Sequence, residues 1–271
     1  MNPIRVGAVS YLNTKPLVYG IEAHADEIDL CFDLPSRLAD RLNSGDLDVA
    51  LIPSIEAIAN ADYTILSDAC IGCRGPVWSV KLLSRVPASE IKTLSMDEGS
   101  RTSRILGRII LSEQFGVRPQ LSQLNMSDPW QSVSTDAVMI IGDRAMTAAP
   151  PEFPFVWDLG EAWNDWTGLP FVFAVWAARA DNRLEPHFDR LAAILSQARN
   201  QGIENIDAIS NENAAQYGLT ETVCRNYLSD NLYFQLGDAE KRGLAAYFRY
   251  ASDLNVIAPN LQLQFHDCQT A

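Results

Sequence analysis

Short apolar runs alternate with amphipathic segments of helical period along most of the chain. Runs of four to six residues bounded by turn-forming residues are typical of buried strands, whereas apolar residues three or four apart indicate helices. Strands are predicted at 4–9, 30–32, 48–52, 93–96 and 137–141. Helices are predicted at 35–43, 103–115, 205–217, 221–228 and 238–254, with a further helix that begins at Leu184 and ends before Gly202.

Two of these strands are followed directly by polar residues that begin a helix. The strand at 4–9 leads into Ser10–Leu17, where Pro16 lies just inside the predicted helix, and the strand at 48–52 leads into Pro53–Glu56. Repeated strand–helix units of this kind predict an open parallel sheet, in which ligands bind beyond the carboxyl ends of the strands. We therefore expect both turns to face one cleft.

Two long extended segments, 75–84 and 169–176, lie on either side of a block of about 90 residues. This layout predicts an α/β fold in which a second lobe is inserted into the first and two crossing strands form the hinge. The predicted lobes are residues 1–83 with 173–271, and residues 84–172. The arrangement resembles type II periplasmic-binding-protein-like domains, which hold a ligand in the cleft between the lobes and close around it.

Composition narrows the class of ligand. The chain has 271 residues, of which 47% are hydrophobic, and a net charge of −13. That charge argues against nucleic acid and anionic membranes as partners, and no apolar run approaches the roughly 20 residues that span a bilayer. An anionic ligand would therefore need a local source of positive potential.

The amino-terminal residues lack the pattern of an export signal, so we expect a cytoplasmic protein with reduced thiols.

Metal and covalent chemistry find little support. Cys70 and Cys73 form a C-x-x-C pair, but zinc needs two further ligands and no second pair is present. We interpret both as incidental loop cysteines. His24, His187 and His266 are scattered, and no Gly-x-Ser-x-Gly motif occurs. The prediction is a site without a metal.

The segment Gly99–Ser103 is the most informative local feature. Ser100, Thr102 and Ser103 lie at the start of an amphipathic helix, where free N–H groups and the helix dipole favour an anion. Simple helix capping is the alternative, since one hydroxyl suffices for a cap. Three hydroxyls beside Arg101 favour anion binding.

Other polar residues are candidates for the opposite wall of the cleft. Asn13 can donate and accept hydrogen bonds, although ordinary turn chemistry explains it equally well. Ser79 lies on a candidate hinge strand, where a packed hydroxyl is the alternative. Arg74 either supplies charge or is solvated. Of the aromatic residues between 157 and 176, most are expected in the core and one or two at the cleft.

Six motifs at compatible spacing make the chain resemble a known family. They are Val9-Ser10-Tyr11-Leu12-Asn13-Thr14-x-Pro16-Leu17, Gly45-x-Leu47-Asp48-Val49-Ala50, Gly75-Pro76-Val77-x-Ser79, Ser100-Arg101-Thr102-Ser103, Ile141-Gly142-Asp143 and the segment Trp166–Trp176. In this order, over nearly the whole chain, they resemble the chorismate dehydratases of the futalosine route to menaquinone.

The resemblance implies the two-lobed fold and the conversion of chorismate to 3-[(1-carboxyvinyl)oxy]benzoate and water, with no cofactor or metal. It implies that Asn13 and Ser79 are catalytic. The implied substrate contacts are Ser10, Tyr11, Ser54, Gly75, Pro76, Ser100, Arg101, Thr102, Ser103, Gly142 and Asp143. The sister enzyme of the pathway uses a histidine near its first turn, which this chain lacks; Lys15 and Arg74 depart from the family pattern.

The general base is left open among Asp143, Glu56 and the substrate's own side-chain carboxylate. Two other functions also stay open. One is a non-catalytic binding protein for a small acid, because this fold serves transport and sensing widely. The other is a related enzyme that acts on a different cyclic acid.

Overall fold

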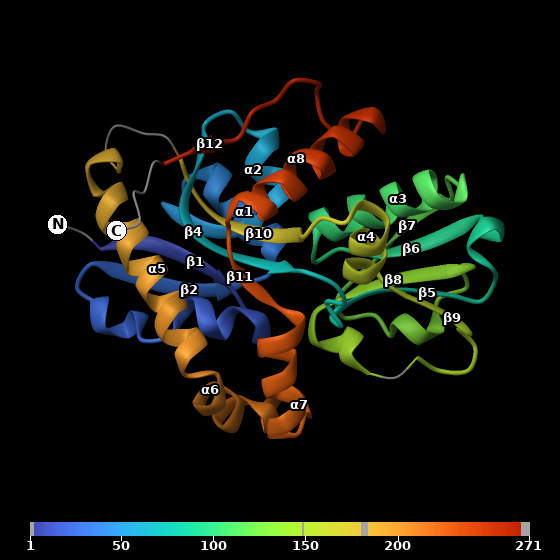
Figure 1. Ribbon diagram of the computed structural model, residues 1–271, viewed down its shortest axis with the longest axis horizontal. Coiled ribbons are helices and arrows are strands. Elements are labelled where there is room, and N and C mark those ends of the chain that lie inside the picture. Colours follow the sequence, from blue (N-terminus) through green and yellow to red (C-terminus); the bar gives the residue numbers. More distant parts are fainter. Residues whose placement is uncertain (1–2, 148, 180–183, 267–271) are drawn as a thin grey trace.

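The computed structural model of the protein describes residues 3–147, 149–179 and 184–266, which form two α/β lobes, each built on its own sheet (Figure 1). The strands are β1 (Ile4–Val9), β2 (Ile28–Asp33), β3 (Val49–Pro53), β4 (Tyr63–Cys73), β5 (Val80–Ser84), β6 (Thr93–Asp97), β7 (Gln120–Leu124), β8 (Ala137–Ile141), β9 (Phe155–Asp158), β10 (Phe171–Arg179), β11 (Tyr233–Gln235) and β12 (Gln264–Phe265). The main helices are α1 (Pro35–Ser44), α2 (Ser54–Ala59), α3 (Arg101–Phe115), α4 (Leu159–Thr167), α5 (Phe188–Glu204), α6 (Ile206–Asn213), α7 (Glu221–Asn226) and α8 (Asp238–Asp253). The predicted α/β, two-lobed fold is confirmed.

The sheet of the larger lobe has the strand order β11-β4-β10-β3-β1-β2, with β12 beside β4. β1 is parallel to β2 and β3, as predicted, but β10 is antiparallel to both β3 and β4. The expectation of an open parallel sheet is therefore correct only for its first three strands. The sheet is mixed because β4 leads toward the smaller lobe and β10 leads back from it.

β4 was not predicted, because polar residues interrupt its apolar pattern. Ser67 and Asp68 lie in the middle of this strand and find their partners on α5. The Ser67 hydroxyl is 3.1 Å from the Ser196 hydroxyl, and the Asp68 carboxylate pairs with the Arg199 guanidinium at 3.1 Å. Tertiary contacts that the local sequence does not reveal thus stabilise the strand.

The sheet of the smaller lobe has the order β7-β6-β8-β5-β9. The predicted extended segment 75–84 is a turn followed by β5, whose partners among the described strands are β8 and β9, both in the smaller lobe. The chain returns to the larger sheet between β9 and β10, through α4. The division at residues 83/84 and 172/173 stays a proposal; the smaller sheet itself extends from Val80 to Asp158.

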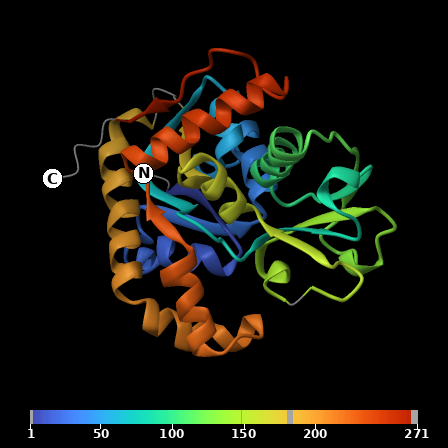
Figure 2. The same cartoon turned by 45° about the vertical axis from the view of Figure 1, so that its right-hand side comes forward.

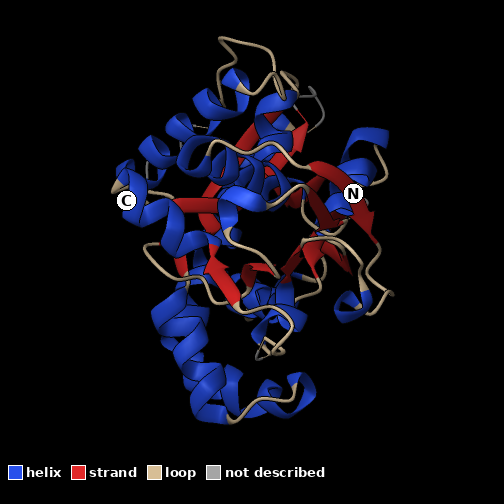
Figure 3. Cartoon of the chain, turned by 90° about the vertical axis from the view of Figure 1, so that its right-hand side faces the viewer, coloured by secondary structure: helices blue, strands red, loops and turns tan. Residues whose placement is uncertain are grey.

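Helices cover the outside of both sheets (Figure 3), and α5 and α8 lie along the larger lobe (Figure 2). The predicted end of α5 before Gly202 is wrong, because the helix continues to Glu204. A β-carbon on Gly202 would lie 2.0 Å from the backbone oxygen of Pro16. Gly202 therefore permits close packing of α5 on the 3-10 helix η1 (Leu12–Val18), rather than ending a helix. No helix within the described ranges is long and apolar enough to cross a membrane.

Candidate functional site

A cavity lies where the two sheets approach each other, and it contains about 480 Å³ of empty space, part of it open to solvent. Both lobes supply its walls, because residues from β1, β3, β4 and β10 face residues from β5, β8 and α3. The apolar lining consists of Val9, Pro35, Pro53, Ile71, Val77, Val80, Ile141, Phe173 and Ala174. A mostly apolar wall with a few polar groups is typical of a small-molecule site.

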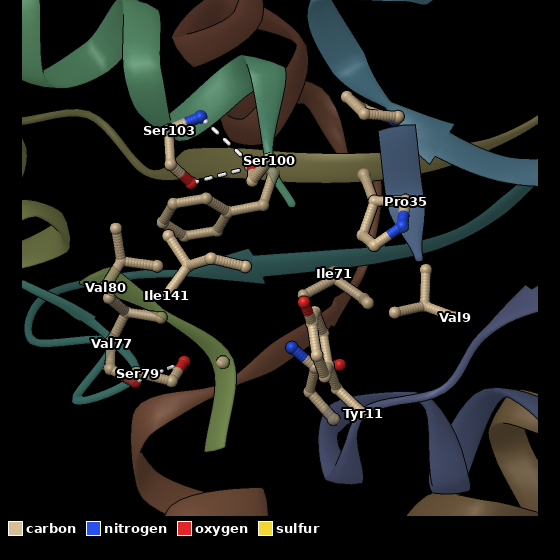
Figure 4. A pocket seen from close by; sticks show the side chains of 15 residues that line it. Val9, Tyr11, Pro35, Ile71, Val77, Ser79, Val80, Ser100, Ser103 and Ile141 are labelled. Carbon is tan, nitrogen blue, oxygen red and sulfur yellow. Dashed lines mark hydrogen bonds between the residues drawn. The ribbon is translucent and has the colours of Figure 1, made fainter. Parts of the chain in front are cut away.

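Five polar side chains line the cavity, together with Gly142. They are Tyr11, Asn13, Ser79, Ser100 and Ser103. Figure 4 shows Ser100 and Ser103 on one wall, Ser79 beside Val77 on another, and Tyr11 on a third. The structure thus brings these predicted residues together from four separate segments. Among the residues that the structure describes, none of those lining the cavity is a carboxylate, histidine, lysine or arginine.

The amino terminus of α3 supplies the positive potential that the lining otherwise lacks. Ser100 is its N-cap: the Ser100 hydroxyl accepts a hydrogen bond of 3.2 Å from the Ser103 backbone N–H and lies 3.0 Å from the Ser103 hydroxyl. The capping alternative is therefore real, but both hydroxyls also face the cavity. A 15-residue helix whose first turn meets an apolar cavity can stabilise an anion there.

Asn13 and Ser79 are connected through a residue that the sequence reasoning missed. The Tyr227 hydroxyl donates a hydrogen bond of 2.9 Å to Ser79 Oγ, and the Asn13 side chain interacts with the same phenol and lowers its pKa. Burial raises the pKa of Tyr227 far above its usual value, so the phenol stays protonated. Tyr227 follows α7 in a helical stretch without a motif, so nothing in the local sequence indicated a role in the site.

Asp158 holds the loop that presents Ser79. Its carboxylate accepts hydrogen bonds from the backbone N–H groups of Val77, at 2.9 Å, and Trp78, at 2.5 Å. The same side chain caps α4 through the N–H groups of Gly160 and Glu161. Trp78 has a φ of 63°, a conformation that costs energy for a side chain of this size. One carboxylate thus stabilises both a strained loop and a helix start.

Replacement of Asp158 by alanine is expected to lower the free energy of unfolding by about 1–3 kcal/mol, since a cap and two loop hydrogen bonds are lost. Urea unfolding followed by circular dichroism measures the change. Asp165→Ala, on an exposed position of the same helix, is the matched control and should change stability little. Equal stabilities for the two variants would contradict this role.

Seven predicted contact residues do not line the cavity. Ser10 and Pro76 are exposed, and Gly75 is partly exposed in the same loop as Pro76. Ser54 is buried behind Pro53, where its hydroxyl donates to the Val172 carbonyl at 2.8 Å. For these four residues, contact with a substrate stays a prediction. The remaining three, Arg101, Thr102 and Asp143, have other partners.

Arg101 and Thr102 connect the two lobes. The Arg101 guanidinium contacts the Asp40 carboxylate at 2.8 Å and the Glu56 carboxylate at 3.3 Å, on α1 and α2 of the larger lobe. The Thr102 hydroxyl accepts a hydrogen bond of 3.3 Å from the Ile55 backbone N–H. Arg101 therefore supplies its charge outside the cavity, and both residues fix the position of α3 relative to α2.

Asp143 lies beside the cavity on the 3-10 helix η5 (Gly142–Met146). Its carboxylate accepts a hydrogen bond of 3.4 Å from the Leu12 backbone N–H, which joins the lobes on this side. Burial raises the pKa of Asp143 to about 6, and the single backbone hydrogen bond from Leu12 offsets only part of this effect.

This raised pKa makes stability depend on pH. In the folded protein Asp143 binds a proton up to about pH 6, whereas in the unfolded chain it releases the proton near pH 4. The folded state therefore binds more protons between these values, so stability decreases as pH rises from 4 to 6. Asp143→Asn should be more stable than wild type by about 1–2 kcal/mol at pH 7, after allowance for partial solvation, and equally stable near pH 4. Urea titrations across this range test the expectation; a gap independent of pH would refute it.

The cysteines are not loop residues, contrary to the prediction. Cys70 and Cys73 lie on β4 with their thiols buried, and burial raises the pKa of Cys73 to about 12. Both are free thiols within the core. In the described part of the chain no group of three or more potential ligands could hold a metal ion. Arg74 does not line the cavity: its side chain is half exposed to solvent, as one of the two alternatives had it, and also pairs with the buried Glu240 carboxylate at 2.8 Å.

Comparisons with known proteins identify the family of the chain and its fold. A family model described as menaquinone biosynthesis matches residues 4–253. A chorismate dehydratase of Thermus thermophilus is 28% identical over 264 residues, which cover 91% of this chain and 94% of the relative.

Solved structures share the fold at low sequence identity. Protein AF1704 from Archaeoglobus fulgidus matches with a TM-score of 0.71 and 17% identity, over 94% of this chain and 98% of that protein. The periplasmic aliphatic sulphonate binding protein SsuA from Escherichia coli matches with a TM-score of 0.63 and 15% identity, over 97% and 96%. These two likenesses establish the two-lobed binding-protein architecture and nothing about the ligand.

Proposed function

The chain belongs to the menaquinone-biosynthesis family whose model matches residues 4–253, and on this premise we propose that it is a chorismate dehydratase. As a carbon–oxygen hydro-lyase it converts chorismate to 3-[(1-carboxyvinyl)oxy]benzoate and water. The observation that supports this most is the shared cavity, in which Ser100 and Ser103 at a helix terminus face Asn13 and Ser79. The full-length similarity to a chorismate dehydratase agrees with it.

Chorismate has two carboxylates and an apolar ring, and the cavity suits both. The first turn of α3 can accept one carboxylate on its N–H groups and on the hydroxyls of Ser100 and Ser103. The apolar residues of the lining then enclose the ring. Since the described lining has no arginine or lysine, the helix terminus is expected to be the main anion-binding group.

The reaction removes one ring proton and one ring hydroxyl. The proton is acidic because the ring carboxylate delocalises the charge left on carbon, and donors at α3 stabilise that charge. The C–H electron pair then forms the new ring double bond as the C–O bond breaks, and the hydroxide departs. Asn13 or Ser79 assists by hydrogen bonding to this leaving group, which with the removed proton becomes water. Aromatisation supplies the driving force, so no cofactor or metal is required.

The removed proton needs an acceptor, and we assign that role to the substrate's own side-chain carboxylate. No carboxylate from the described ranges lines the cavity. Asp143 is hydrogen-bonded to the Leu12 backbone, and Glu56 is paired with Arg101. Both protein carboxylates therefore have structural partners outside the lining.

We also place the reaction in the cytoplasm, which the free thiols of Cys31, Cys70, Cys73 and Cys224 favour.

A non-catalytic binding protein is the rival function, because SsuA, a protein with the same fold, binds aliphatic sulphonates. Incubation of the purified protein with chorismate separates the two. A dehydratase yields an aromatic product detectable by absorbance and about 18 Da lighter by mass, the loss of one water. A binding protein binds chorismate in calorimetry but leaves it intact. An enzyme for another acid neither binds chorismate nor converts it.

A further inference from the structure

The hydroxyl of Tyr227 occupies a position from which it can control the catalytic hydrogen bond of Ser79. Tyr227 is 1% exposed and reaches Ser79 from the stretch after α7, 148 positions along the chain. Trp78 packs edge-on against its ring, with centroids 5.6 Å apart. The phenol is therefore held against the strained loop that presents Ser79.

The directions of the hydrogen bonds are well defined. The Tyr227 hydroxyl donates to Ser79 Oγ at 2.9 Å, so Ser79 is the acceptor in this pair. A serine hydroxyl has one proton and two lone pairs. Because Tyr227 occupies a lone pair, the Ser79 proton must be donated elsewhere. Its present acceptor is the Val77 carbonyl at 3.4 Å, a long and weak bond.

We propose that Tyr227 is the positioning residue that directs the Ser79 proton toward the departing hydroxyl of the substrate. The proposal rests on the chorismate dehydratase function proposed above. A ligand oxygen in the cavity can easily replace the Val77 carbonyl as the acceptor of the Ser79 proton, because that bond is weak. The Tyr227 bond meanwhile keeps the Ser79 side chain in one rotamer. Tyr227 does not touch the substrate and transfers no proton.

The test is a double-mutant cycle on chorismate turnover with Tyr227→Phe and Ser79→Ala. Tyr227→Phe should lower kcat about tenfold, with KM changed less than about threefold, because an oriented donor acts mainly in the transition state. In the Ser79→Ala background the same change should lower kcat less than about threefold. Tyr63→Phe, which removes another buried tyrosine hydroxyl outside the cavity, is the control and should retain wild-type kcat.

Loss of the phenol leaves a buried serine lone pair unsatisfied, so folding of each variant is checked by thermal unfolding. If Tyr227→Phe does not fold, the double variant, which lacks both partners, is compared with Ser79→Ala alone. Equal rates support the proposal. A rate reduced tenfold again in the double variant, or a Tyr227→Phe enzyme with wild-type kcat, overturns it. An inactive wild-type protein instead refutes the dehydratase function itself.

Discussion

Replacement of Ser103 by aspartate is expected to raise the KM for chorismate at least about a hundredfold while the protein stays folded. The third position of α3 is favourable for an acid, because a carboxylate there interacts with the helix dipole and complements the Ser100 cap. In the cavity, however, the new charge lies where a substrate carboxylate should bind. Two like charges about 4 Å apart repel by roughly 4 kcal/mol at an effective dielectric constant of 20. Initial-rate kinetics give KM, and circular dichroism reports folding.

Ser103→Asn is the matched control, since it has nearly the same shape as aspartate without the charge. It should change KM less than about tenfold. If the aspartate and asparagine variants have the same KM, the α3 terminus does not bind a carboxylate of the substrate.

Alanine at Asn13 or at Ser79 is expected to lower kcat at least about tenfold, equivalent to about 1.4 kcal/mol of transition-state stabilisation. Both side chains line the cavity, where Ser79 accepts a hydrogen bond from Tyr227 and Asn13 lowers the pKa of the same phenol. Loss of either donor leaves the departing hydroxide less stabilised, whereas substrate binding at α3 is unaffected. The reduction should therefore fall on kcat more than on KM.

Ser44→Ala and Asn205→Ala serve as controls for this pair. Both remove polar side chains that hydrogen-bond backbone carbonyls far from the cavity, those of Arg41 and Gln201. They should leave kcat unchanged. Near-normal kcat in both cavity variants would end the assignment of Asn13 and Ser79 as catalytic residues.

The sequence predicted the elements whose stability is local. α1 and α3 have regular apolar stripes and end at Gly45 and Gly116, both in the left-handed conformation. These local patterns were enough to predict both helices and where they end. β4 was missed because its polar residues are satisfied by α5, 129 positions away for the Ser67–Ser196 pair. The direction of β10 likewise depends on the path of the chain through the smaller lobe, which no local pattern encodes.

The same distinction applies to the site. Residues within matched motifs, such as Asn13, Ser79 and Ser100, were placed in one cavity by the structure. Arg101 was predicted to contact the substrate from its position beside three hydroxyls, but its side chain extends away to Asp40 and Glu56. Tyr227 belongs to no motif, and only the tertiary structure brings its hydroxyl to Ser79.

A crystal structure of the Ser79→Ala variant with chorismate bound tests the binding geometry most directly. One carboxylate should lie within hydrogen-bond distance of the backbone N–H groups at the start of α3, and the ring hydroxyl should face Asn13 and the position of the missing Ser79 hydroxyl. Chorismate bound outside this cavity, or with no carboxylate at the helix terminus, would contradict the account.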